Sequence, residues 1–283
     1  MRKLGVHTSI SGGLHLSLER AHALGCTTMQ IFSHNPRGWA VKEITAEAAA
    51  QFISLRAQYD ISPVYIHASY LINLATHERM LQKKSVGLLI EEMNRADAIG
   101  AEYVILHAGS SSTDAAQVAR KRAIGALNVV ARQGKWRVGL LIENTAGERG
   151  DISSLMTELS EIMEGVHGSL IGGVCIDTAH AFAAGYNIRS AEGAEILRDE
   201  ILRYLGQNSV KLIHLNDSKR AAGSHVDRHE HIGCGNIGSA GLRQFITGVH
   251  FSGIPLILET PKKNDSDDIR NLRRVRKMLE REL

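Results

Sequence analysis

The sequence predicts an α/β protein that forms a single (β/α)8 TIM barrel, with its functional site at the carboxyl-terminal rim of the strands. Eight short apolar runs recur along the chain, and a segment long enough for a helix follows each of them. The runs are nearly continuous in apolar character, which is typical of parallel strands covered on both faces. The length of 283 residues is also close to the ~250 residues typical of this barrel. An open doubly wound sheet is the alternative architecture.

Each expected element can be placed along the chain. The strands are expected at residues 4–6, 28–32, 64–66, 103–106, 138–142, 173–176, 211–215 and 254–258. The helices are expected at residues 14–24, 45–59, 81–100, 114–132, 151–163, 191–205, 239–247 and 266–282. In the third helix, Leu81, Leu88 and Leu89 recur at helical spacing, and Gly100 ends the pattern. Strict alternation of this kind favours a parallel sheet.

Composition and charge exclude several classes of protein. The chain has 43% hydrophobic residues, with 33 Lys+Arg against 30 Asp+Glu, so its net charge is +3. This balance is that of a globular protein and excludes wholesale disorder or a fibrous repeat. The small positive surplus does not by itself indicate a nucleic-acid partner. With only four prolines and no linker-like stretch, we expect one domain over residues 1–283.

The sequence also bears on the compartment. No stretch approaches the ~18 uninterrupted apolar residues of a membrane helix, and the first residues do not lead into a signal-peptide core. Cys26, Cys175 and Cys234 form no CxxC pair and no disulfide framework, which agrees with a reducing environment. We therefore expect a cytoplasmic protein without a membrane partner.

Ionisable side chains stand at or just after the ends of seven of the eight expected strands. They are His7, His67, His107, Glu143, Asp177, His214 and Glu259. Because all strands of a barrel point the same way, these side chains should converge on its carboxyl-terminal rim. One such histidine alone is most simply a residue that caps a strand. Several ionisable groups at one depth, however, carry a steep desolvation cost unless something compensates them. A bound cation is the simplest compensator, and His with Asp and Glu is the ligand set of catalytic Zn²⁺, Mn²⁺ or Fe²⁺.

Two local spacings add further candidate ligands. Asp177 and His180 are three residues apart, so a turn after the strand can aim both inward. Asp227 and His229 are two apart and share one side of an extended segment. The nine candidates are His67, His107, Glu143, Asp177, His180, His214, Asp227, His229 and Glu259. Because an open four-coordinate metal uses about three protein ligands, nine point to two or three ions. Such a multinuclear centre suits hydrolysis of a phosphodiester.

Eight stretches distributed over almost the whole chain match one known family. They are GVHTSISGG at 5–13, HASYLINLA at 67–75, LHAGS at 106–110, IENTAG at 142–147, GVCIDTAHAFAAGY at 173–186, HLNDSK at 214–219, VDRHEHIGCGNIG at 226–238 and LET at 258–260. The sequence therefore resembles the endonuclease IV class of apurinic/apyrimidinic (AP) endonucleases. The stretches arrive in the family's order, and those at 173–186 and 226–238 are long and unusual strings.

The resemblance implies a barrel that holds three zinc ions, with Mn²⁺ able to substitute, on all nine candidate ligands. The first site consists of His67, His107 and Glu143. Glu143 bridges to a second ion, which is held also by Asp177, His214 and Glu259. The third site consists of His180, Asp227 and His229.

The resemblance also implies a reaction on double-stranded DNA. The backbone is cleaved 5′ to an abasic site, leaving a 3′-hydroxyl and a 5′-deoxyribose phosphate, and blocked 3′ ends are trimmed. Glu143 and Glu259 are the expected catalytic residues. Glu259 either helps to deprotonate or orient the attacking water or acts only as a ligand. In a prokaryote, such a repair enzyme would associate with the nucleoid.

DNA recognition is expected from loops at the same rim, because the target phosphate reaches the metals only if the abasic nucleotide leaves the duplex. In the family that the sequence resembles, Arg37, Tyr70 and Leu71 match the positions that enter the base stack. From the residues alone, Tyr70 and Leu71 would be packing residues at a helix start. Five further polar residues are expected to contact phosphates, namely Ser9, Asn35, Lys219, Arg220 and Arg228.

The sequence departs from the family pattern in two places. Ala108 replaces the proline expected after His107, which keeps the ligand but leaves the loop less rigid. Cys234 stands where a charged or polar residue is expected, close to the third site. It is either a tolerated loop substitution or an oxidisable thiol that disturbs zinc occupancy. His34 is expected to be an exposed loop residue.

Two other functions remain as alternatives. A divalent-metal sugar isomerase or epimerase on the same barrel would need equivalents of only Glu143, Asp177, His214 and Glu259. The other five candidate ligands would then have no use, which favours the nuclease. A catalytically silent DNA-binding protein with a structural metal centre is the second alternative. In the absence of a long exposed apolar helix, we expect a monomer.

Overall fold

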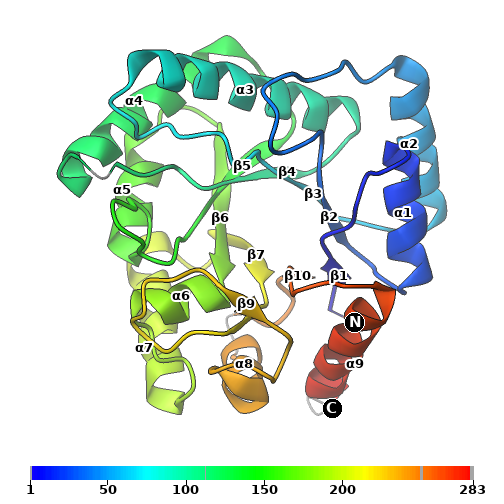
Figure 1. The fold of residues 1–283 in the computed structure, drawn as a ribbon, viewed down its shortest axis with the longest axis vertical. Coiled ribbons are helices and arrows are strands. Elements are labelled where there is room, and N and C mark those ends of the chain that lie inside the picture. The colour runs from blue at the N-terminus through cyan, green and yellow to red at the C-terminus, as the bar shows by residue number, and fades with distance from the viewer. Residues whose placement is uncertain (1, 112, 249–250, 281–283) are drawn as a thin grey trace.

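Eight parallel strands form the centre of the computed structural model, which describes residues 2–111, 113–248 and 251–280 (Figure 1). The strands are β1 (Leu4–Val6), β2 (Met29–Phe32), β3 (Val64–His67), β4 (Tyr103–Leu106), β5 (Gly139–Glu143), β6 (Ile171–Asp177), β7 (Val210–His214) and β10 (Leu256–Leu258). Their order in the sheet is β1-β10-β7-β6-β5-β4-β3-β2, so neighbours in sequence are neighbours in space.

The two ends of this sheet meet and close it. A parallel bridge joins His7, just after β1, to Gln30 of β2. The Thr8 amide also donates to the Gln30 carbonyl at 2.8 Å. An open doubly wound sheet has two free edges and reverses its strand order, whereas this order runs once around a ring. The prediction of a (β/α)8 barrel is confirmed, and the open-sheet alternative is wrong.

Helices surround the barrel on the outside (Figure 1). They are α1 (Leu14–Ala23), α2 (Ala46–Gln58), α3 (Arg79–Ala98), α4 (Ala116–Gln133), α5 (Met156–Gly165), α6 (Thr178–Ala184), α7 (Ala191–Glu200), α8 (Gly238–Ile246) and α9 (Asp265–Leu279). Side-chain caps fix some of their starts; the Thr45 side chain, for example, accepts from the Ala48 amide at the start of α2. Within the described residues, none of the helices is long and apolar enough to cross a lipid bilayer.

The structure differs from the sequence-based expectation in several elements. The short helix α6 directly after β6 was not expected as an element. The expected helix 191–205 divides into α7 and a π-helical turn, η1 (Ile201–Leu205). A short antiparallel pair, β8 (Asp217–Ser218) and β9 (His229–Glu230), stands apart from the barrel. Helix α5 starts at Met156 rather than at residue 151, and residues 281–282 of the expected last helix lie outside the described residues.

Two apolar layers hold the barrel together. Between strands and helices lies the main core, which includes Val64, Ile66 and Leu140. Inside the barrel, a smaller buried cluster fills the lumen and consists of Tyr65, Ile105, Leu141, Cys175, Leu212 and Ile257. Because side chains alternate along a strand, residues two positions further on also point into the lumen. This periodicity determines where the polar residues at the strand ends point.

Candidate metal centre and nucleic-acid interface

Six of the nine candidate ligands occupy the lumen positions just beyond the apolar inner layer. Each lies two residues after a member of that layer, and they are His67, His107, Glu143, Asp177, His214 and Glu259. Glu143, Asp177 and His214 are fully buried. The strand period therefore gathers these side chains at the carboxyl-terminal end of the barrel, as the sequence predicts.

The first ligand group consists of His67, His107 and Glu143. Glu143 Oε2 lies 3.1 Å from His107 Nε2 and 3.4 Å from His67 Nε2. All three ligand atoms are within 4.8 Å of one another, which is close enough for one ion to contact them together. This is the same trio that the resemblance to the endonuclease IV class implies for the first site.

The second group shares Glu143 with the first and adds Asp177, His214 and Glu259. His214 Nδ1 lies 2.9 Å from Glu143 Oε1, 3.3 Å from Glu259 Oε2 and 4.0 Å from Asp177 Oδ2. The two oxygens of Glu143 thus face different groups. A carboxylate in that position can bridge two neighbouring ions.

The third group consists of His180 and His229 with two carboxylates. Asp177 shares a ligand cluster with both histidines. Asp227 lies 3.2 Å from His180 Nε2 and 3.3 Å from His229 Nε2. Helix α6 places His180 here because the Asp177 carboxylate accepts from the His180 amide at 2.8 Å and so caps the helix. The resemblance implies Asp227 but not Asp177 for this group, whereas the geometry offers both.

Several buried polar atoms in this cluster lack a hydrogen-bond partner, and a bound metal ion would take the place of one. Among the described residues, no hydrogen-bond partner exists for the Nε2 atoms of His107, His180 and His229 or for Glu143 Oε2. Buried polar atoms are normally hydrogen-bonded because an unpaired one costs free energy. Imidazole nitrogens and carboxylate oxygens without thiolate are suitable ligands for Zn²⁺ and Mn²⁺. The residues present therefore fit bound metal ions.

The histidines are oriented through their second ring nitrogen. Nδ1 of His67, His180 and His229 lies 2.8, 2.9 and 3.1 Å from the carbonyl oxygens of Ala68, Asn144 and Glu259, respectively. A carbonyl can only accept, so each Nδ1 carries a proton, and Nε2 is the ring nitrogen left to face a metal ion. Such backbone contacts fix the tautomer and orientation of metal-binding histidines.

Three buried amide side chains support the cluster and were not found from the sequence. The Gln30 carbonyl oxygen lies 2.7 Å from His214 Nε2, and its amide donates to Glu259 Oε1 at 2.5 Å. Asn216 donates to Asp177 Oδ2 at 2.7 Å and accepts from the Glu259 amide. Asn144 accepts from the Asp177 amide at 2.7 Å. The available signal was a polar residue in an apolar strand for Gln30, and an amide one or two residues after a candidate ligand for the other two.

Opposite charges stabilise one another in the metal-free cluster. Burial by itself raises the pKa of Glu143 and Glu259, but His214 and neighbouring histidines outweigh it and hold both pKa values well below the ordinary value. For Asp227, burial is likewise outweighed by His180 and His229, and its pKa is about 2. The carboxylates are therefore ionised at neutral pH, as metal ligands must be.

Cys175 also lies within ligand distance of Glu143 and His214. It belongs to the apolar inner layer, and burial raises the pKa of its thiol to about 12. A thiol, unlike a thiolate, is a poor metal ligand, so Cys175 serves as an apolar lumen residue in the metal-free protein.

The candidate DNA-contacting residues lie on loops at the same rim. Ser9, Asn35 and Arg37 are exposed, as are Lys219, Arg220 and Arg228. Tyr70 is 65% exposed, and its ring packs against Phe32 with a centroid distance of 5.1 Å. Leu71 is half-buried and packs against the core. A cavity of about 440 Å³ is lined by Tyr70 and Arg228 together with several candidate ligands. Of the candidate DNA-contacting residues, Tyr70 and Arg228 therefore lie at the cavity that contains the candidate ligands.

The expectation that His34 is exposed is wrong. The residue is buried, with 8% of its surface exposed, and its Nε2 lies 2.9 Å from Glu92 Oε1. The reason is a buried carboxylate on α3, which pulls the loop after β2 onto that helix. Cys234, by contrast, is exposed as a loop residue, and its sulfur accepts from Arg274 at 2.9 Å.

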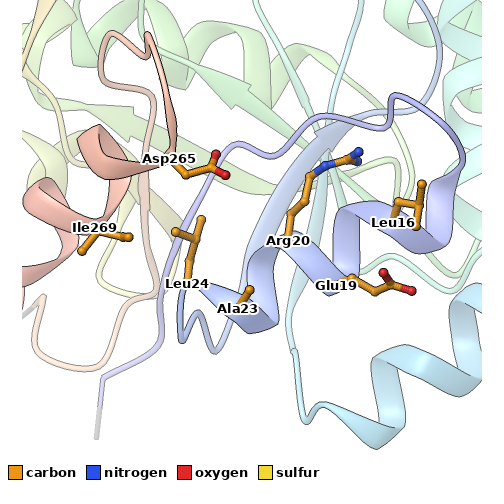
Figure 2. Close-up of a pocket in the computed structure, with 7 residues that line it drawn as sticks. All are labelled: Leu16, Glu19, Arg20, Ala23, Leu24, Asp265 and Ile269. Atoms are coloured by element: carbon orange, nitrogen blue, oxygen red, sulfur yellow. The ribbon is translucent and has the colours of Figure 1, made fainter.

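A second hollow lies elsewhere on the surface, between α1 and α9 (Figure 2). Its volume is about 380 Å³, and its lining includes Leu16, Leu24 and Ile269 but none of the nine candidate ligands. Arg20 also lines it and donates to the carbonyls of Ser9 and Ser11 at 2.7 and 2.8 Å. This helix residue therefore holds the loop that carries Ser9.

Fold and site together define a TIM-barrel enzyme with adjoining groups of histidines and carboxylates that could hold metal ions. A family model described as xylose isomerase-like TIM barrel matches residues 18–281. A protein named probable endonuclease 4 from Halothermothrix orenii is 40% identical over 265 residues, which cover 94% of this chain and 95% of the relative. The chain belongs to this endonuclease 4 family within the xylose isomerase-like TIM barrels.

Solved structures agree with this assignment. The crystal structure of endonuclease IV from Thermus thermophilus has 36% sequence identity and a TM-score of 0.87, with 99% of each chain covered. A D-tagatose 3-epimerase-like protein has 18% identity and a TM-score of 0.74, with 98% of this chain and 97% of that chain covered. At that identity, the second likeness shows the fold alone.

Proposed function

We propose that the protein is a zinc-dependent AP endonuclease of DNA repair. It hydrolyses the phosphodiester 5′ to an abasic site in double-stranded DNA, leaving a 3′-hydroxyl and a 5′-deoxyribose phosphate, and it trims blocked 3′ ends. The observation that carries the proposal is the gathering of all nine candidate ligands into three adjoining groups at one end of the barrel. The relatives' name, endonuclease 4, supports the same reading.

Three zinc ions, with Mn²⁺ as a substitute, would be held by the groups centred on His107, His214 and His229. When bound, such ions supply an acidified water and stabilise negative charge on an attacked phosphate and its leaving oxygen. The protein contributes the positions of the ligands, which the strand ends and the buried amides fix before any substrate arrives.

Glu143 and Glu259 have different tasks in this proposal. Glu143 is fully buried among four histidine rings and serves as the shared ligand. Glu259 lies at the cavity wall, where Gln30 holds one carboxylate oxygen and leaves the other 3.3 Å from His214. An ionised carboxylate in this position can accept a proton from, or orient, the attacking water.

The rim loops hold the DNA. Arg37, Tyr70 and Leu71 enter the base stack beside the abasic nucleotide, since an Arg, an aromatic and an aliphatic side chain suit a wedge. Phosphates on either side contact Ser9, Asn35, Lys219, Arg220 and Arg228. The protein acts as a monomer in the compartment that holds the genome, the cytoplasm of a prokaryote.

A sugar isomerase or epimerase would use only the second group, Glu143 with Asp177, His214 and Glu259. The epimerase-like neighbour is 18% identical, so its likeness shows the barrel fold alone. The first and third groups would then be buried polar atoms without a role, and their desolvation would be uncompensated.

The direct test is incubation with an end-labelled duplex that contains one abasic site, with and without a strong chelator. We expect one new 3′-hydroxyl end immediately 5′ to the lesion, and no cleavage with the chelator. Two results would refute the proposal. One is cleavage on the 3′ side of the lesion, which leaves an unsaturated aldehyde on the new 3′ end. The other is cleavage that resists the chelator.

A further inference from the structure

A buried charged cluster lies beneath two rim loops and outside the metal centre. Glu92, on α3, is 1% exposed, and Arg95, one turn further along the same helix, is 9% exposed. Removing a carboxylate and a guanidinium from water costs substantial free energy unless both are well bonded. The partners of these two side chains therefore indicate what they are for.

Every hydrogen bond that Glu92 makes through its carboxylate ends on a loop that follows a strand. Oε2 accepts from the Ser33 hydroxyl at 2.6 Å, just after β2. Oε1 pairs with His34 Nε2 at 2.9 Å and accepts from the Ser69 amide at 3.1 Å, just after β3. One carboxylate thus joins the two loops to a single point on α3.

Arg95 reinforces the first of these loops. Its Nε donates to the Ser33 hydroxyl at 2.8 Å. The rest of the guanidinium donates to the backbone carbonyls of Ser33 and Lys42. The Ser33 hydroxyl therefore accepts from Arg95 while it donates to Glu92, and it links the two charges without a direct ion pair.

Ser69 connects the two loops directly. Its hydroxyl donates to the Pro36 carbonyl at 2.7 Å and accepts from the Leu71 amide at 3.2 Å. Pro36 adjoins Arg37, and Leu71 adjoins Tyr70. The network thus ends on the backbone of the segments that carry the proposed wedge side chains.

We propose that Glu92 and Arg95 are positioning residues that hold the loops of Arg37 and Tyr70 at one fixed separation before DNA binds. The proposal rests on the proposed function, because it assigns these loops to the abasic nucleotide. If the loops are fixed in advance, DNA binding does not have to order them, and the free energy of binding is more favourable by that amount. Stability alone does not account for the cluster, since well-packed apolar residues often replace a buried ionic network without loss.

The test compares Glu92→Gln with Glu91→Gln, a matched change at the exposed neighbouring glutamate of the same helix. The amide nitrogen of a glutamine at position 92 is a donor, whereas the Ser33 hydroxyl and the Ser69 amide that face it also donate. At least one hydrogen bond to the loops is therefore lost. For each variant we would measure bound metal, affinity for abasic and intact duplexes of one sequence, and KM and kcat for incision.

For Glu92→Gln, we expect KM and the dissociation constant for the abasic duplex to rise about tenfold or more. Affinity for the intact duplex, bound metal and kcat should change little, and Glu91→Gln should match the wild type. A merely structural role would instead lower metal content and both affinities together. That outcome, or unchanged affinity for the abasic duplex, would overturn the proposal.

If Glu92→Gln does not fold, Ser69→Ala decides the question by the same criteria. It removes only the hydroxyl between the loops and nearly conserves buried volume. If the wild-type protein binds abasic and intact duplexes with equal affinity, the proposed function is refuted, and the positioning role with it. Equal preference in wild type and variants would refute the positioning role alone.

Discussion

Glu143 belongs to two of the candidate ligand groups and connects them. One of its oxygens faces His67 and His107, and the other faces His214 at 2.9 Å and His180 at 3.4 Å. A fully buried carboxylate with an unpaired oxygen would be costly in an apolar lumen. Its position between two ligand groups accounts for that burial.

At Glu259, a single substitution separates a chemical role from a structural one. We expect Glu259→Gln to lower the rate of abasic-site incision by at least about a hundredfold. An amide is a weaker proton acceptor and a weaker metal ligand than the carboxylate that it replaces. Binding to the abasic duplex and the unfolding temperature should be retained. Incision kinetics and calorimetry would show this, with exposed Glu195→Gln as the control. Loss of folding would assign Glu259 a structural role instead.

Gln30 provides a second test at the same scale. It holds both His214 and Glu259, so Gln30→Leu should weaken metal affinity by about tenfold to a hundredfold, as is typical for residues that orient ligands. Competition with a coloured chelator measures the affinity. The matched control is Gln51→Leu at an exposed position of α2. An unchanged affinity would mean that Gln30 only fills space.

At the scale of elements, strand ends carry most of the candidate ligands, and loops carry the proposed DNA contacts. Tyr70 belongs to the loop after β3 and is largely exposed, so its truncation removes little packing. We expect Tyr70→Ala to weaken abasic-duplex binding by roughly tenfold, the size of one lost base-stacking contact. Metal content should stay at the wild-type value. Fluorescence anisotropy with abasic and intact duplexes measures the effect, and unaltered binding and incision would reject the wedge role.

The strands and most helices were predictable because their patterns are local. Apolar runs separated by helical segments determine a parallel barrel regardless of side-chain detail. The short helix α6 was missed because its seven residues are nearly all apolar and continue the strand β6 without a break. The start of α5 was placed too early because the Glu158 carboxylate accepts from the amides of Ser154 and Leu155, which caps the helix so that it begins at Met156.

The candidate site was predictable to the extent that it follows the strand period. His67, Glu143 and Asp177 stand at strand ends, and their convergence follows from the barrel alone. The pairing of His34 with Glu92 joins residues 58 positions apart, and no local pattern signals such a contact. The same holds for Gln30 and His214, which only the closed barrel brings together.

For the molecule as a whole, the metal centre should contribute to stability as well as chemistry. Strands from across the barrel supply its ligands, so bound ions link β3, β5 and β7 at one end. Removing them should lower the unfolding temperature by at least about 5 °C, since ions well above their dissociation constant stabilise only the folded state. Calorimetry before and after dialysis against a chelator measures this, and Zn²⁺ should restore the original value. An unchanged temperature would contradict a centre of several tightly held ions.

The metal stoichiometry of the purified protein tests the central claim most directly. Three adjoining ligand groups predict about three zinc ions per chain by elemental analysis, falling to about two when His229 is replaced by alanine. A single Mn²⁺ or Mg²⁺ ion per chain, unaffected by that substitution, would contradict the account and favour a sugar isomerase or epimerase.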